Sequence, residues 1–176
     1  IMYIYGWASA LFGHEYYSIR IVDALYHLVA LYIYFRILRR YVTTDTLAYL
    51  SVFVYTLLYV GSGYASTAQA ESFVFLPMIT IFYGAEHATH QQTRKERTLY
   101  PILAGISLFT IFTLKPTLVA IPLSMFAWKI LTSSGMRKRI ARYTLSTLAV
   151  LSILLAIALL WLEHNNALEF VREYLQ

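Results

Sequence analysis

The sequence predicts an all-α polytopic membrane protein, from its composition, the length of its apolar stretches and the positions of its few charges. Of the 176 residues, 59% are hydrophobic and 13% are charged, whereas a soluble domain is about 45–50% apolar and about 25% charged. Several stretches are apolar on every face, as expected of helices surrounded by lipid. Cysteine is absent, which removes disulfides, thiolate metal sites and cysteine nucleophiles. The composition therefore excludes a water-soluble globular domain and a disordered chain.

Apolar stretches of spanning length follow one another along the chain. Residues 1–13 are apolar but too short to cross a membrane as helix, so we expect either a helix lying in the outer interface or the end of a truncated span. A crossing needs about 20 apolar residues. The candidate spans are Ile19–Leu38, Thr46–Gly63, Gln69–Glu86 with Pro77 at its middle, and Tyr143–Leu162.

The remaining apolar stretch, Leu99–Thr132, is too long for one crossing and is interrupted by Lys115 and Pro116. Proline lacks a backbone N–H and disfavours helix in the residue before it, so we expect a break there. Two crossings, joined as a hairpin at Lys115-Pro116, also place all the basic clusters on one side of the membrane, in keeping with the positive-inside rule. The sequence thus predicts about six membrane segments, including this short helical hairpin, plus the N-terminal interfacial helix.

Most basic residues occur in three clusters at the ends of apolar stretches. Aromatic residues that would stack bases are not interleaved with them, which argues against nucleic acid as a partner. We expect the loops 36–45, 87–98 and 133–142 to be cytoplasmic and the protein to lie in the plasma (inner) membrane. The clusters comprise Arg36, Arg39 and Arg40; Arg94, Lys95 and Arg97; and Arg137, Lys138, Arg139 and Arg142.

A single transmembrane domain over residues 1–176 is the simplest organisation. It divides into an interfacial or truncated segment (1–18), membrane helices (19–162) and the start of an extracytoplasmic segment (163–176). The chain begins with Ile1 in an apolar run without a basic n-region or a cleavage site, so we expect it to be part of a longer polypeptide.

Lys115 is the strongest candidate for a binding residue. A lysine deep in an apolar stretch is costly and needs a reason, and a helix beginning at Pro116 would add positive potential beside the ammonium group. This combination favours a phosphate or carboxylate ligand. The structural alternative is a lysine that snorkels from a hairpin turn.

Further ionisable residues map to the same, outer side. Arg20 and Asp23 lie on one helix face, where they pair locally or line a cavity, with Arg20 as an anion contact. His27 follows Asp23 at i, i+4, and a neutral histidine bonded to Asp23 is favoured over a metal ligand. We expect no metal site. The other residues expected to line an outer cavity are Glu71, Gln69 and Tyr64, and Glu71 is also explained by the helix dipole alone.

Two runs resemble membrane glycosyltransferases of the GT-C fold, the relatives of protein O-mannosyltransferases and aminoarabinose transferases. The run Leu11–Leu25, LFGHEYYSIRIVDAL, resembles their segment before the first long span, and Leu103–Thr117, LAGISLFTIFTLKPT, is similar to their lysine-proline hairpin. The resemblance covers most of residues 1–132.

The resemblance implies a polyprenyl-phosphate-linked sugar donor and transfer on the extracytoplasmic face by direct displacement. Lys115 would contact the donor phosphate, and Arg20 would be a structural or phosphate-side group. The family's catalytic Asp precedes the matching region, so the catalytic residue is unknown here, and Asp23 stands where serine is usual. No cofactor is implied beyond the donor lipid. The alternative is a non-catalytic membrane subunit that packs against other subunits of a larger complex.

Overall fold

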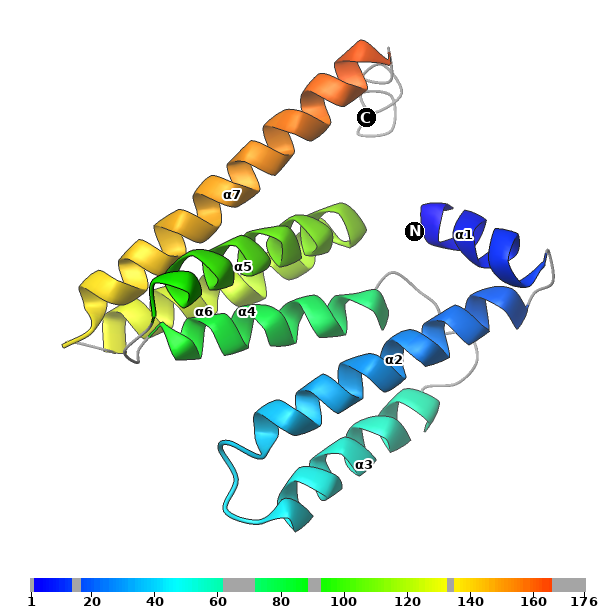
Figure 1. The fold of residues 1–176 in the computed structure, drawn as a ribbon, viewed down its shortest axis with the longest axis horizontal. Coiled ribbons are helices and arrows are strands. Elements are labelled where there is room, and N and C mark those ends of the chain that lie inside the picture. Colours follow the sequence, from blue (N-terminus) through cyan, green and yellow to red (C-terminus); the bar gives the residue numbers. More distant parts are fainter. Residues whose placement is uncertain (1, 14–16, 62–71, 89–92, 133–134, 166–176) are drawn as a thin grey trace. The chain divides into compact units, whose positions relative to one another are not determined.

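The computed structural model describes residues 2–13, 17–61, 72–88, 93–132 and 135–165, and the regular elements within these ranges are all helices (Figure 1). The all-α prediction is thereby confirmed. Three of the helices are long and apolar enough to cross a membrane, where about six crossings were expected; they are α2 (Tyr17–Leu38), α5 (Arg94–Leu114) and α7 (Arg137–His164). Two further apolar helices, Asp45–Gly61 and Pro116–Thr132, are shorter.

The described chain forms two compact units, Ile1–Ile79 and Thr80–Gln176. In the first, α1 (Met2–Phe12) and α3 (Asp45–Gly61) both pack against α2. The helix α1 is followed by Gly13, whose φ of 87° lies in the left-handed region that glycine adopts without strain. The Ser18 hydroxyl donates to the Gly13 carbonyl at 2.6 Å, which ties the end of α1 to the first turn of α2. A short 3₁₀ turn, η1 (Ser72–Val74), also contacts α2 and leads into α4 (Phe75–His87).

The second unit is built on the packing of α5 against α7. At Lys115 the chain leaves α5, and η2 (Pro116–Val119) and α6 (Ala120–Thr132) return towards the start of α5 (Figure 1). The helix α6 also packs on α7. The hairpin expected at Lys115-Pro116 is therefore present, for the expected reason: Lys115 has extended backbone angles (φ −155°, ψ 92°) and Pro116 occupies the first helical position.

Two basic clusters expected in loops lie largely inside helices. Residues 94–97 form the first turn of α5, because Thr93 and Glu96 form a capping box in which each side chain bonds the other's backbone N–H. Residues 137–142 form the first turns of α7. The loop boundaries 87–98 and 133–142 are thus too wide. The remaining cluster, Arg36, Arg39 and Arg40, lies at the end of α2 and in the turn that follows it. There Arg39 donates to Asp45 at 2.7 Å.

Pro77 does not lie at the middle of a long span. Helix α4 begins at Phe75, so Pro77 falls in its first turn, where a missing N–H costs no intrahelical hydrogen bond. At 13 residues, α4 is shorter than the expected span Gln69–Glu86, and residues 69–71 of that span lie outside the described part of the chain.

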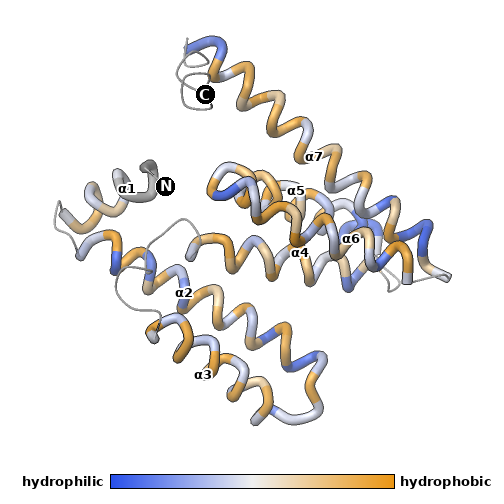
Figure 2. Tube along the Cα trace, turned by 180° about the vertical axis from the view of Figure 1, so that it is seen from behind, coloured by the Kyte–Doolittle hydropathy of each residue, from blue (hydrophilic) through white to orange (hydrophobic). Residues whose placement is uncertain are grey.

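Figure 2 shows hydrophobic residues along most of α7 and hydrophilic ones at its ends. The packed side of this helix holds Ile140, Tyr143 and Thr147, which are buried. Its other apolar side chains are exposed or half-buried, as expected for a helix that faces lipid or another protein surface.

The contact between α5 and α7 depends on Gly105. A Cβ atom at this position would lie 2.5 Å from Cβ of Val150 and 3.0 Å from the main-chain oxygen of Thr147. The Thr147 oxygen belongs to the backbone of α7, so it cannot move aside as the end of a flexible side chain can. We expect Gly105→Ala to lower the free energy of unfolding by about 1–3 kcal/mol, as overpacked cores do. Thermal unfolding in detergent micelles measures the change. Gly6→Ala is the matched control, because a Cβ there meets nothing within 4 Å; an equal Tm for both variants would contradict the close packing.

Candidate functional site

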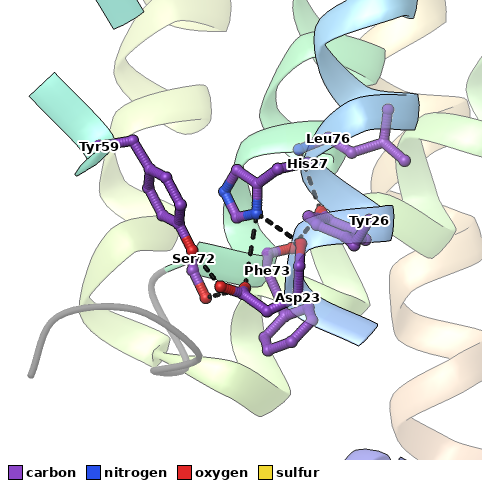
Figure 3. Close-up of polar contacts among 7 residues, drawn as sticks. All are labelled: Asp23, Tyr26, His27, Tyr59, Ser72, Phe73 and Leu76. Atoms are coloured by element: carbon purple, nitrogen blue, oxygen red, sulfur yellow. Dashed lines mark hydrogen bonds and ion pairs between the residues drawn. The ribbon is translucent and has the colours of Figure 1, made fainter. Parts of the chain in front are cut away.

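The first unit contains a buried polar cluster centred on Asp23 (Figure 3). Asp23 is 2% exposed, and its carboxylate accepts a hydrogen bond from the Tyr59 hydroxyl and one from Ser72 Oγ at 3.0 Å. Tyr59 belongs to the last turns of α3 and Ser72 to η1. One carboxylate thus joins three elements that are far apart in the sequence.

A second set of bonds lies beside the first. The Tyr26 hydroxyl donates to the Phe73 carbonyl at 2.6 Å and accepts from the Leu76 N–H at 3.2 Å. It therefore satisfies the backbone where η1 passes into α4, at the place where the first N–H groups of a helix have no intrahelical partner. Both α2 side chains, Asp23 and Tyr26, thus hold the same short turn.

His27 completes the cluster as the i, i+4 spacing predicted. Its Nδ1 lies 3.0 Å from the main-chain oxygen of Asp23 and 3.4 Å from Oδ1 of the same residue. Both are acceptors, so Nδ1 carries the proton in the neutral ring. The ring stacks on Tyr59 with centroids 4.1 Å apart and is 4% exposed. Within the described residues, nothing bonds its Nε2.

This arrangement stabilises a charge inside an apolar helix. A carboxylate in such surroundings is costly unless several donors surround it, and Asp23 has Tyr59, Ser72 and His27 as partners. The described residues contain no group of three or more metal-ligating side chains, and the cluster has one carboxylate and one imidazole. The cluster around Asp23 is therefore a buried hydrogen-bond network that holds α2, α3 and η1 together.

The remaining predicted site residues are distributed as follows. Arg20 lies one turn before Asp23 in α2 and is half-buried, in the first unit. Lys115 is also half-buried but belongs to the second unit, so their convergence on one cavity stays a prediction. The expected cavity residues Tyr64, Gln69 and Glu71 lie outside the described residues.

Sequence reasoning missed Tyr59 and Ser72, and it missed an ion pair in the second unit. There Lys129 of α6 pairs with Glu86 of α4. The sequence did indicate that partners exist, because a charged residue in an apolar stretch is costly unless another group pairs with it. The chain has 16 tyrosines, so that rule does not select Tyr59 among them.

The fold and these sites are those of a helical chain compatible with membrane insertion, in which Asp23 has hydrogen-bond donors and Glu86 pairs with Lys129. No protein-family model, curated protein or solved structure matches the chain.

The hydroxyl of Tyr59 is expected to stabilise the first unit. We expect Tyr59→Phe to reduce the free energy of unfolding by about 0.5–2 kcal/mol, because it removes a donor from a buried carboxylate. Tyr49→Phe is the matched control on the same helix, since Tyr49 is exposed. Thermal unfolding of both variants in micelles measures the difference, and a double-mutant cycle with Asp23→Asn isolates the pair. Equal stabilities of the two tyrosine variants would contradict this role.

The tautomer of His27 is a separate prediction. Because Nδ1 faces two acceptors, we expect the neutral ring to be protonated at Nδ1, the less common tautomer in solution. Nitrogen-15 NMR of histidine-labelled protein distinguishes the two forms by the shifts of their ring nitrogens. His27→Phe serves to assign the signal. A neutral ring protonated at Nε2 would show that Asp23 does not hold it as described.

Proposed function

We propose that this chain is the membrane part of a GT-C-type glycosyltransferase that transfers a sugar from a polyprenyl-phosphate donor to an acceptor on the extracytoplasmic face. The observation that carries the proposal is the position of Lys115. It is the one extended residue between α5 and η2, so it stands at the tip of an apolar hairpin.

The surroundings of Lys115 suit an amphiphilic phosphate. Its backbone is satisfied locally, with its N–H bonding Ile111 and its carbonyl accepting from Leu118, at 2.8 and 3.0 Å. The large apolar residues Phe112 and Ile121 are exposed on the helices either side. A cation at the end of an apolar surface matches a ligand with a phosphate head and an isoprenoid tail.

The reaction places specific demands on such a cation. In direct displacement, an acceptor hydroxyl oxygen attacks the anomeric carbon, and the bond from that carbon to the phosphate oxygen breaks. The phosphate leaves with the bonding electron pair, and a base takes the hydroxyl proton. An ammonium group beside the phosphate stabilises the charge that grows on the leaving oxygen. The base is not assigned to a residue of this chain.

A specific observation favours the alternative, a non-catalytic membrane subunit. The carboxylate of Asp23 is occupied by Tyr59, Ser72 and His27, and that of Glu86 by Lys129. Charges arranged in this way hold helices together. On this alternative the exposed apolar faces contact other subunits, and Lys115 has no preference for a phosphate.

Binding of a short prenyl phosphate tests the proposal directly. The purified chain in micelles is titrated with farnesyl phosphate and, as the uncharged probe, farnesol. We expect the phosphate to bind more tightly and Lys115→Ala to weaken it by about tenfold to a hundredfold, because a hydrogen bond to a charged group is lost. Farnesol binding is expected to stay unchanged.

Two further variants control this experiment. Lys115→Arg keeps the charge and is expected to retain most of the phosphate preference, whereas Arg36→Ala removes an exposed cation from the other unit and is expected to have no effect. Where sugar transfer from a polyprenyl-phosphate donor is measurable, Lys115→Ala is expected to lower it at unchanged expression. Equal binding of farnesyl phosphate and farnesol would refute the phosphate role and favour the subunit alternative.

A further inference from the structure

One end of the second unit carries an unusual concentration of positive charge. Helix α6 returns from the end of α5 towards its start and α7 follows α6, so α5 and α7 begin at the same end of this unit (Figure 1). Where the two helices meet, Gly105 of α5 and Thr147 and Val150 of α7 each lie about three turns from the start of their helix. Arg137 also donates to the Leu131 carbonyl at 3.2 Å, which joins the start of α7 to the end of α6. The side chains at this basic end are all exposed: Arg94, Lys95, Arg97, Arg137, Lys138, Arg139 and Arg142.

The acidic residues in the described part of this unit do not neutralise the basic end. Between residues 80 and 165 the sequence contains Glu86, Glu96 and Glu163. Glu86 pairs with Lys129, and Glu96 accepts bonds from the backbone and hydroxyl of Thr93 in the capping box. Glu163 lies at the opposite end of α7. The excess of cations is therefore local.

Helix stability does not account for these cations. The first turn of a helix carries positive potential from the backbone dipoles and favours acids, whereas cations there are unfavourable. In α7 the first turn contains no acid, and the cap residue Met136 makes no side-chain hydrogen bond. Basic residues placed against the dipole point to an external source of negative charge.

The neighbouring surface indicates where that charge lies. Trp128 and Leu131, in the last turn of α6, are 67% and 69% exposed. Leu145, just beyond Arg142 on α7, is also exposed. Cations at the helix starts, followed along the helices by an exposed tryptophan and exposed aliphatic side chains, have the layering of a membrane interface, in which indole lies at headgroup level and aliphatic groups reach the acyl chains. A nucleic acid would leave these apolar groups in water.

We propose that the basic end binds the headgroups of anionic phospholipids. Lipid phosphates lie over the cations at the starts of α5 and α7, and the acyl chains pack against the exposed apolar residues below them. The inference needs only membrane insertion and is independent of the proposed glycosyl transfer.

Electron spin resonance of the full chain in phosphatidylcholine bilayers tests this surface. Spin-labelled phosphatidylglycerol and phosphatidylcholine are added in turn, and the motionally restricted fraction gives their relative association constants. We expect phosphatidylglycerol to be preferred several-fold and the preference to fall on adding salt, because the cations are exposed and screened. The seven cations act together through the local potential, so R94Q/K95Q/R97Q, which removes three of them, is expected to lower the preference by about half or more.

The matched control is R36Q/R39Q/R40Q, which removes three cations from the first unit. There Arg36 bonds the Tyr32 hydroxyl and Arg39 pairs with Asp45, so the control is expected to keep most of the preference. Equal association of the two lipids with the unaltered chain, or equal losses in the two triple variants, would overturn the proposal. Displacement of labelled phosphatidylglycerol by a short RNA would identify a different partner and also overturn it. Should a variant fail to fold, the unaltered chain still tests the proposal: a preference for phosphatidylglycerol that falls on adding salt supports it, and a preference that does not change with salt overturns it.

Discussion

In an apolar environment, every polar group needs a partner within the protein or a place at the boundary with water. The charged groups of the described chain follow this constraint in two ways. Most of its charges lie at helix ends, and the charges within its apolar helices are paired: Asp23 with donors from three elements, Glu86 with Lys129. The Asp23 pairing positions η1 against α2 and α3, and it thereby sets where α4 begins. One buried carboxylate thus organises most of the first unit.

Prolines show how far local sequence determines this fold. Pro116 breaks the chain as expected, whereas Pro77 begins a helix and Pro101 lies inside α5 without ending it. The same missing N–H has three outcomes because the neighbouring contacts differ. Pro101 is buried in a helix that packs along α7, and the Arg97 carbonyl, which an N–H at position 101 would bond, lies in the first turn of α5. The sequence shows which backbone N–H groups are missing, but the packing of the neighbouring helices decides whether a helix ends, begins or continues at each proline.

The same division applies to the candidate sites. The spacing of Asp23 and His27 predicted their contact, because both lie on one helix and i, i+4 neighbours meet. Tyr59 and Ser72 were not predictable, since their pairing with Asp23 depends on how separate helices pack. The break at Lys115 was predictable because it depends on two adjacent residues. Helix boundaries at the basic clusters were missed because the Thr93–Glu96 capping box extends α5 into a stretch that composition alone marks as loop.

The two ends of the second unit differ in how their cations are placed, and this difference distinguishes the two kinds of phosphate recognition proposed for them. Lys115 is half-buried at a hairpin tip, where a lower local dielectric would strengthen its interaction with a single anion. The cations of the basic end are exposed and spread over the starts of two helices, where each interaction is weak and screened but many act together. A half-buried cation beside apolar groups suits selection of a single amphiphile. A dispersed set suits a continuous anionic surface, and it also fixes which end of the helices faces that surface. With the basic end at an anionic bilayer surface, as proposed, the hairpin tip that carries Lys115 would lie at the end of the unit away from that surface.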